Sequence, residues 1–165
     1  MEDEDRVLSS LELVLFDLAG TTVDDRVAGE PLVAAAMVES FAEAGYRLGL
    51  EDVQPHRGKM KIEMIRCLFA GKMKAVDRNF EDETLRIHGL FLNRIMAGVD
   101  RMNEVEGATE TFRFLKDRRI KVGVGSGFPG EIVEQIISRM GWRRKGFWTT
   151  RPVPIRLAQA GLILR

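Results

Sequence analysis

An aspartate follows a short apolar run near the start of the chain, and a small polar turn comes directly after it. Leu13 to Phe16 are β-prone residues, Asp17 ends the run, and Gly20, Thr21 and Thr22 follow. A carboxylate at the end of a buried strand costs free energy unless it meets a ligand or another charge. Glycine lets backbone approach a ligand closely, while threonine hydroxyls and backbone N–H groups bind phosphate oxygens. The pattern predicts a carboxylate beside a phosphate-type ligand.

A second glycine-rich turn follows a second apolar run, Ile120 to Gly125. Residues 125–130 fit G-x-G-x-x-G, which binds dinucleotides when an acidic residue follows about 20 positions later. A nicotinamide or flavin site is disfavoured, because no acidic residue follows Glu134 and because Pro129 stiffens the loop. Ser126, at a strand end and beside a helix N-terminus, can instead hold a phosphate oxygen. The alternative is a simple strand-to-helix turn.

The two motifs together resemble the haloacid dehalogenase superfamily, and within it the phosphonatase-like branch, over roughly residues 11–142. The superfamily opens with an apolar strand ending in D-x-D-x-T. The phosphonatase branch has D-x-A-G-T instead, and residues 17–21 match it as D-L-A-G-T. The resemblance implies that Asp17 is the nucleophile and a Mg²⁺ ligand, and that the Ala19 carbonyl is a second ligand. It also assigns Ser126 to the second motif, a Ser or Thr that closes a strand.

Ala19 bears on the choice of chemistry. In phosphomonoesterases of the superfamily, the residue at this position is an aspartate that protonates the leaving alkoxide and later activates water. Alanine can do neither, so ester cleavage should be poor. The resemblance therefore favours cleavage of a P–C bond in a small phosphonate, with a small phosphate ester as the alternative substrate.

In the phosphonatase branch, help for the leaving group comes from a cap lysine in the pattern M-G-x-x-K, which forms a Schiff base with an aldehyde. Residues 57–61 read R-G-K-M-K, so the resemblance assigns this role to Lys61. Arg57 replaces the family's methionine, and Met64 replaces a histidine found three residues after the lysine. A lysine in the first turn of a helix, near a second lysine, is biased toward the neutral amine. The alternative for Lys61 is a solvated helix lysine.

A third family motif is a basic residue in the context G-R-P-x-P, and Arg151 in the run T-R-P-V-P resembles it. The fourth motif, acidic residues that complete the Mg²⁺ shell, has no match, and one carboxylate with one carbonyl would hold Mg²⁺ weakly. A truncated, catalytically inactive protein or binding remnant is therefore a rival interpretation. The residues expected to bind substrate are Gly20, Thr21, Arg57, Gly58 and Gly127.

The chain order is strand, three helices, helix, strand, helix, which is an α/β pattern. It predicts a haloacid dehalogenase-type fold: a Rossmann-like parallel-sheet core, incomplete at its C-terminal end, with an inserted helical cap. The core is expected at residues 1–24 and 100–165 and the cap at 25–99. Only two strands are convincing, with a weaker third around 147–150. Helices are expected at 31–44, from Lys59 or Lys61 to 71, and at 81–97, 108–118 and 129–140.

Three side chains with chemical potential have plainer interpretations. Leu85, His88, Leu92 and Ile95 share a helical stripe, so His88 is expected to be a core or cap-interface histidine. His56 is expected to be a solvated loop residue. Cys67 has no acid or histidine at the spacing of a nucleophile and is expected to be a small core residue.

Composition places the chain among ordinary globular proteins. Its 165 residues are 45% hydrophobic and 30% charged with no net charge, so no global field attracts nucleic acid or anionic membrane. A single cysteine, an acidic N-terminus and no apolar stretch of bilayer length predict a cytoplasmic protein with neither kind of partner. The resemblance allows a homodimer through the cap. After Gln135 there are two tryptophans and seven basic residues but no acid, and an unusual terminus is preferred to a nucleic-acid footprint there.

Overall fold

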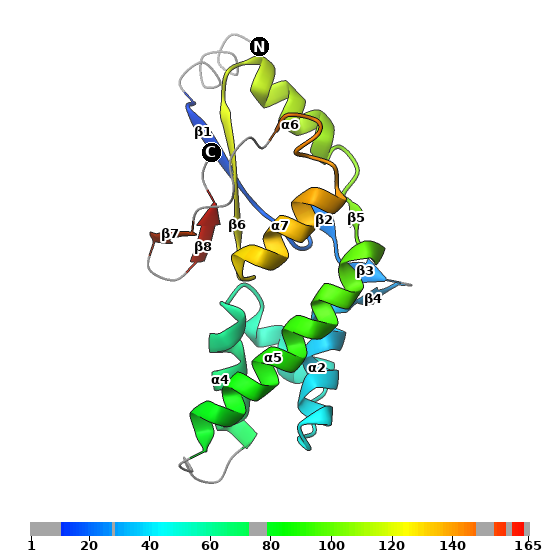
Figure 1. The fold of residues 1–165 in the computed structure, drawn as a ribbon, viewed down its shortest axis with the longest axis vertical. Helices are drawn as coiled ribbons and strands as arrows, with labels where there is room; N and C mark the ends of the chain where they lie inside the picture. Colours follow the sequence, from blue (N-terminus) through cyan, green and yellow to red (C-terminus); the bar gives the residue numbers. More distant parts are fainter. Residues whose placement is uncertain (1–10, 28, 73–78, 148–153, 158–159, 164–165) are drawn as a thin grey trace.

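The computed structural model describes residues 11–27, 29–72, 79–147, 154–157 and 160–163 (Figure 1). It contains a mixed sheet with two helices toward one end of the molecule and a cluster of helices toward the other. The predicted α/β fold with a parallel strand pair is confirmed.

The parallel pair brings both chemical motifs to one edge of the sheet. Asp17 lies opposite Gly125 in the register, so Asp17 and Ser126 stand at neighbouring strand ends. The sequence predicted two convincing strands, but a hairpin adds two more; its short, mixed segments carry little periodic signal. Phe147 lies in no strand, and residues 148–150 lie outside the described part of the chain. The sheet order is β1 (Leu13–Asp17), β6 (Lys121–Ser126), β8 (Ala160–Ile163) and β7 (Pro154–Leu157), and only the first pair is parallel.

An aromatic cluster joins the parallel strands to their helices. Phe112 of α6 (Ala108–Asp117) has its ring centroid 5.3 Å from that of Phe16 on β1 and 5.0 Å from that of Trp142. Trp142 follows α7 (Gly130–Arg139), which begins just after the second motif. Edge-to-face contacts of this kind add to the burial of apolar area. Phe112 is therefore the packing centre of this end of the molecule.

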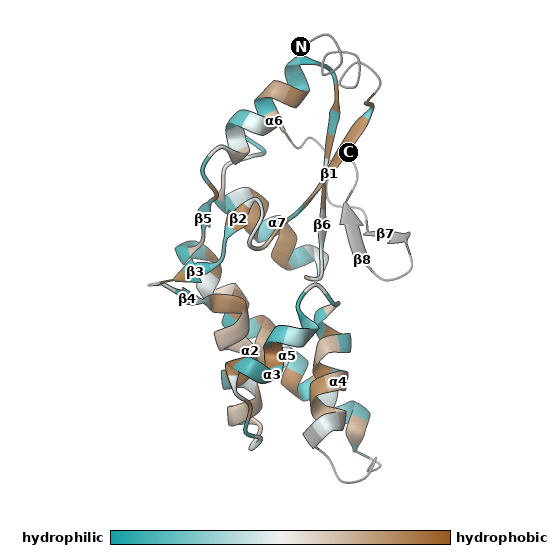
Figure 2. Cartoon of the chain, turned by 180° about the vertical axis from the view of Figure 1, so that it is seen from behind, coloured by the Kyte–Doolittle hydropathy of each residue, from teal (hydrophilic) through white to brown (hydrophobic). Residues whose placement is uncertain are grey.

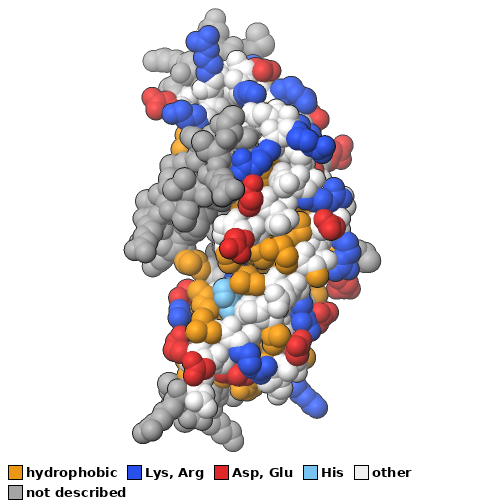
Figure 3. Space-filling model, viewed as in Figure 1, with side chains coloured by type: hydrophobic (Ala, Val, Ile, Leu, Met, Phe, Trp, Pro, Cys, Tyr) orange, Lys and Arg blue, Asp and Glu red, His pale blue; other side chains and the backbone are white. Residues whose placement is uncertain are grey.

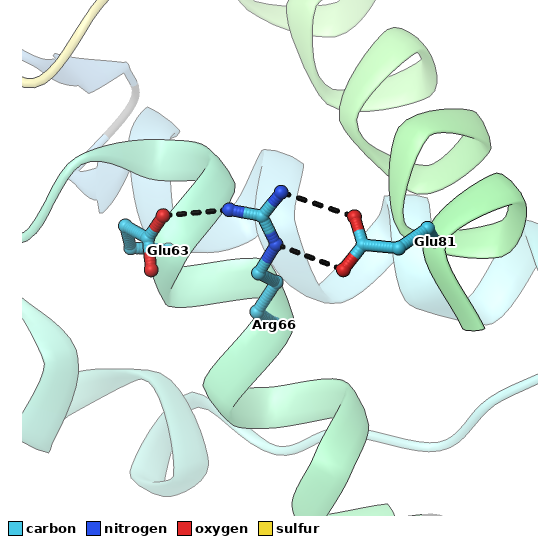
Figure 4. Close-up of polar contacts among 3 residues, drawn as sticks. All are labelled: Glu63, Arg66 and Glu81. Atoms are coloured by element: carbon cyan, nitrogen blue, oxygen red, sulfur yellow. Dashed lines mark hydrogen bonds and ion pairs between the residues drawn. The ribbon is translucent and has the colours of Figure 1, made fainter. Parts of the chain in front are cut away.

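The second end is built from helices that pack on one another, with Met37, Phe41, Phe69 and Phe91 fully or almost fully buried. Hydropathy alternates along these helices, as amphipathic segments require (Figure 2). Arg66 joins Glu63 on its own helix to Glu81 at the start of the next one, with N–O distances of 2.6 and 3.0 Å (Figure 4). The elements are α2 (Leu32–Glu43), α3 (Leu50–Val53), η1 (Gln54–His56), α4 (Lys61–Lys72), α5 (Phe80–Gly98) and η2 (Val99–Arg101).

In the helical layer, the stripe predicted for α5 is right at Ile95 but wrong at Leu85, and the prediction for Cys67 is wrong. The buried stripe of α5 runs through Thr84, Ile87, Phe91, Ile95 and Gly98, whereas Leu85 is 57% exposed. Both stripes satisfy the spacing of three and four residues, and only packing against α2 and α4 selects between them. Cys67 is exposed and is not a core residue.

His88 is half-buried on α5, and burial lowers its pKa. This partial burial agrees with a residue at the margin of the core. His56 is also half-buried, and its Nδ1 lies 3.1 Å from Lys59 Nζ.

Two chain segments cross between the helical layer and the sheet, and they pair with each other. β2 (Val23–Asp24) and β5 (Asn103–Glu104) form an antiparallel ribbon, and Val105 N–H donates to the Thr22 carbonyl at 3.0 Å. A short hairpin, β3 (Arg26–Val27) with β4 (Glu30–Pro31), leads into α2.

Glu104 anchors this ribbon to the sheet end of the molecule. Its carboxylate accepts hydrogen bonds from Thr109 N–H at 2.7 Å, Trp142 Nε1 at 2.9 Å and Lys145 Nζ at 3.2 Å. Burial alone would raise the pKa of Glu104, but these hydrogen bonds outweigh it and lower the pKa. Arg143, from the same acid-free stretch as Lys145, pairs with Glu134 at 2.6 Å.

The surface shows no field of one sign on the side drawn in Figure 3, where basic and acidic side chains are interspersed. Apolar side chains gather near the middle of that view, where α5 packs against α7. Among the described residues, no helix has the length and apolar character to cross a bilayer.

Replacing the central aromatic should test this packing. Phe112→Ala is expected to lower the free energy of unfolding by about 3–5 kcal/mol, because it removes a buried ring and leaves a cavity. Phe114→Ala, on the same helix but 41% exposed, should cost less than about 1 kcal/mol. Urea unfolding of both variants measures these losses. Similar losses of unfolding free energy in the two variants would mean that Phe112 is not the packing centre.

Candidate active site

A cavity of about 410 Å³ lies where the two strand ends meet the helical layer. Asp17 from β1 and Ser126 from β6 line it from the sheet, and Lys61 lines it from α4. All the predicted site residues within the described part of the chain therefore share one cavity. Arg151 lies outside the described residues. The predicted residues that line the cavity are Asp17, Ala19, Gly20, Thr21, Arg57, Gly58, Lys61, Ser126 and Gly127.

The turn after Asp17 is closed by its own backbone. The Leu18 carbonyl accepts hydrogen bonds from Thr22 N–H at 3.0 Å and Val23 N–H at 2.9 Å, and Gly20 N–H donates to the Val23 carbonyl at 2.7 Å. Gly20 has a φ of +82°, a conformation that favours glycine. These bonds use the Leu18 and Val23 carbonyls rather than that of Ala19.

The two threonines of this turn have different roles. Thr21 is exposed and lines the cavity, as expected for a phosphate contact. Thr22 is buried, and its hydroxyl donates to the Asp17 carbonyl at 3.0 Å. The expectation that both hydroxyls face a ligand is therefore wrong, since Thr22 holds the turn together from inside.

Ser126 is only 5% exposed, and its Oγ accepts a hydrogen bond from Phe128 N–H at 3.1 Å. That contact fixes the hydroxyl oxygen at the strand end and leaves its proton free to be donated into the cavity. The same bond also stabilises a strand-to-helix turn, so it serves both interpretations of the loop.

Lys61 is 9% exposed, which disagrees with the solvated alternative. It begins α4, and its N–H donates to the Gly127 carbonyl at 3.3 Å. Its Nζ lies 5.3 Å from the ring centroid of Phe128, next to the second motif. The helical layer thus delivers an amine directly to the strand ends.

Burial lowers the pKa of Lys61 below its ordinary value, because an apolar environment disfavours the ammonium. The carboxylates of Asp17 and Asp25 oppose this effect, and the Arg57 guanidinium adds to it. The lowered pKa favours the neutral form, which is the form that adds to carbonyl groups.

The loop before α4 passes close to Gly127, the residue that follows β6. A Cβ at this position would lie 2.8 Å from the Lys59 carbonyl oxygen and 3.5 Å from Lys61 Nζ. Arg57, from the same loop, reaches over the first motif, where its Nη2 lies 3.8 Å from the position of a Cβ on Gly20.

Asp25 was missed at the sequence level. It lines the cavity and is only 6% exposed, and its backbone carbonyl accepts Leu32 N–H at 2.8 Å. In the sequence it belongs to the polar run V-D-D-R, which is typical of a solvated linker. Only the fold turns one of these two aspartates inward, so no local signal identifies it.

The donor set for a divalent cation is small. The Asp17 carboxylate and the Ala19 carbonyl lie at the strand end, and no group of three or more His, Cys, Asp or Glu within the described ranges could hold a metal. Mg²⁺ commonly binds one or two carboxylates and keeps waters and substrate phosphate oxygens for the remaining positions. The oxygen donors present fit such a loosely held Mg²⁺.

A family model for haloacid dehalogenase-like hydrolases matches residues 11–150. The phosphonoacetaldehyde hydrolase of Bordetella avium is 31% identical over 137 residues, which cover 78% of this chain and 48% of the relative. The phosphonoacetaldehyde hydrolase of Vibrio campbellii is 29% identical over 140 residues, and the match covers 78% of this chain and 50% of that relative. The chain thus spans about half the length of the curated relatives it matches.

Solved structures share the fold at lower sequence identity. A hydrolase from Pseudomonas syringae has a TM-score of 0.66 at 15% identity, with 79% of this chain and 56% of that chain covered. A phosphonoacetaldehyde hydrolase-like protein from Oleispira antarctica has a TM-score of 0.64 at 22% identity, with 84% and 51% covered. Both likenesses support the α/β architecture.

A methyl group at Gly127 should separate the two layers. Gly127→Ala is expected to lower the free energy of unfolding by about 1–3 kcal/mol, since its Cβ must displace backbone rather than a flexible side chain. Gly130→Ala, where a Cβ meets nothing within 4 Å, is the matched control and should change stability by less than about 1 kcal/mol. Equal effects in denaturant unfolding would contradict the close approach.

The lowered pKa of Lys61 predicts a pH dependence of stability. The unfolded amine has its usual pKa of 10.5, so between the folded value and 10.5 the unfolded state binds more protons and stability rises with pH. The difference in free energy of unfolding between the wild type and Lys61→Met should therefore shift in favour of the wild type as the pH rises toward 10.5. Urea unfolding of both proteins measures this gap, and a gap that moves in the other direction would mean that the folded state favours the ammonium.

Proposed function

Because this chain belongs to the haloacid dehalogenase-like hydrolases, we propose that it acts on a small phosphonate that carries an aldehyde and cleaves its P–C bond. The observation that carries the proposal is the buried Lys61 amine, with its lowered pKa, in the same cavity as Asp17. Relatives named phosphonoacetaldehyde hydrolase support the substrate class.

Lys61 and Asp17 divide the chemistry between the two ends of the substrate. The Lys61 amine adds to the aldehyde carbon and forms an iminium with loss of water. Asp17 then attacks phosphorus, and the electron pair of the breaking P–C bond passes into the iminium to give an enamine. The enamine takes up a proton on carbon, and hydrolysis of the resulting iminium releases the aldehyde and the Lys61 amine. A second water cleaves the aspartyl phosphate.

The phosphoryl group would lie at the strand ends. Thr21 and Ser126 offer hydroxyl donors there, and the backbone N–H groups near Gly20 and Gly127 can approach closely because neither residue carries a Cβ. Arg57 lines the same cavity and supplies positive charge toward the phosphoryl oxygens. We extend the same role to Arg151 from its sequence context alone.

Family members generally use Mg²⁺, and the Asp17 carboxylate with the Ala19 carbonyl would hold it here. When bound, it supplies positive charge that offsets repulsion between the Asp17 carboxylate and the phosphoryl oxygens. Residues 25–99 would act as the cap, because they provide Lys61 and Arg57 to a cavity whose floor belongs to the sheet.

A phosphate ester is the rival substrate, and Ala19 weighs against it. Ester cleavage needs an acid to protonate the alkoxide that leaves, and the alanine side chain offers no proton. A P–C substrate avoids this need because the iminium takes up the electron pair.

Phosphonoacetaldehyde with Mg²⁺ is expected to yield acetaldehyde and phosphate, and borohydride should trap a covalent adduct on Lys61. Lys61→Arg should lose both signals, with turnover falling at least about 1,000-fold since arginine cannot form the imine. Asp17→Asn should lose phosphate release but keep the trapped adduct. Lys59→Arg, which changes an exposed neighbouring lysine, is the control and should retain both.

Intact-mass and peptide mass spectrometry locate the adduct. Trapping that is absent in the wild type would remove the Schiff base from the mechanism. Faster release of phosphate from a simple alkyl phosphate than from phosphonoacetaldehyde would favour the ester alternative.

A further inference from the structure

Asp25 is the only carboxylate among the described residues that is buried. The residue as a whole is 6% exposed, and the hydrogen bonds and ion pairs among the described residues include none of its carboxylate. Buried carboxylates are normally paired or hydrogen-bonded, because desolvation strongly disfavours their charge. An unpartnered one that lines a cavity is therefore positioned to meet something inside that cavity.

The position of Asp25 relates it to Lys61. Asp25 lines the main cavity and also an adjoining one of about 470 Å³, together with Gly20 and Arg57. Its charge acts on the Lys61 amine in the same sense as that of Asp17. The hydrogen bond from Leu32 N–H to its carbonyl holds its backbone at the entry to the helical layer. Asp25, between β2 and β3, and Lys61, at the start of α4, thus line the same cavity, and their charges interact.

Imine formation requires a group that can accept and donate protons. Two protons must leave the Lys61 nitrogen and reach the carbonyl oxygen before that oxygen departs as water. The ionisable side chains that line the cavity, within the part of the chain described, are Asp17, Asp25, Arg57 and Lys61. Arg57 does not release its proton, Asp17 must stay ionised for its later attack on phosphorus, and Ala19 has no ionisable group. Asp25 is the remaining candidate.

We propose that Asp25 is a catalytic residue that carries protons from the Lys61 nitrogen to the carbonyl oxygen of the aldehyde substrate. Asp25 takes one proton from the ammonium, and the amine then forms the N–C bond while the carbonyl π electrons move to oxygen. Asp25 returns that proton to the oxygen. It takes a second proton from nitrogen and delivers it to the hydroxyl, the C–O bond breaks, and water leaves with the iminium in place. The carboxylate is regenerated, and no other reactant is consumed.

A proton carrier and a simple counter-ion predict opposite effects of removing Asp25 on the rate of imine formation. The charges of Asp25 and Asp17 raise the pKa of Lys61, so removing Asp25 leaves more neutral amine. If Asp25 acted by charge alone, Asp25→Asn would speed imine formation near neutral pH. Loss of a proton carrier slows it, by about 100-fold or more on the usual scale of acid–base catalysis.

The inference rests on the proposed function, and the test separates the two. The probe is acetaldehyde, which has no phosphorus and so reports imine formation without P–C cleavage. Cyanoborohydride is added at a concentration where trapping no longer depends on it, and the modification of Lys61 is followed by mass spectrometry. The variants are Asp25→Asn and, as matched control, Asp24→Asn. Asp24 is the exposed neighbour of Asp25, and its carboxylate accepts a hydrogen bond from the Arg26 N–H.

We expect Asp25→Asn to be trapped about 100-fold more slowly than the wild type and Asp24→Asn to match the wild type. Asp25→Ala should be equally slow and should recover in proportion to added formate, which a structural role would not produce. Thermal unfolding checks that the variants fold. If Asp25→Asn does not fold, the response of Asp25→Ala to formate still tests the role of Asp25.

Trapping of Asp25→Asn at or above the wild-type rate, or no response of Asp25→Ala to formate, would overturn the proton-transfer role while leaving the Schiff base intact. Failure of the wild type itself to be trapped would instead overturn the proposed function, and the role of Asp25 with it.

Discussion

The close contact between the Lys59–Lys61 backbone and Gly127 is the constraint on which the candidate site depends. The Lys59 carbonyl approaches so closely that a Cβ on Gly127 would lie 2.8 Å from it, and the Lys61 N–H donates to the Gly127 carbonyl. α4 begins at this contact, and its first residue, Lys61, is only 9% exposed. The lysine is buried by the approach of two backbones rather than by apolar residues alone.

That approach also sets the electrostatics of the cavity. It removes water from around the Lys61 amine, so burial becomes the leading influence on its pKa, and two carboxylates and one guanidinium modify it. The Lys61 amine, the Asp17 carboxylate and the Ser126 hydroxyl come from different elements, α4, β1 and β6. Pairing of β1 with β6 brings Asp17 and Ser126 together, whereas Lys61 reaches them only because the start of α4 contacts Gly127.

The sequence was informative where chemistry and periodicity coincide. Two apolar runs, one ending in Asp17 and one just before Ser126, predicted two strands of a parallel sheet. The helices α2, α4, α6 and α7 were predicted to within about two residues. It could not choose the buried stripe of α5, because two stripes have the same spacing and only neighbouring helices distinguish them. It missed Asp25 for a related reason: V-D-D-R carries no sign of which aspartate the fold turns inward.

The paired crossings of β2 and β5 have a mechanical consequence. Two separate linkers would let the helical layer shift, tilt and twist over the sheet, but here the strands are hydrogen-bonded to each other and Glu104 ties one of them to α6 and Trp142. The ribbon therefore joins the helical layer to the sheet as one hydrogen-bonded unit. Lys61 and Arg57 both belong to the helical layer, so any displacement of that layer as one body would move them relative to Asp17 together.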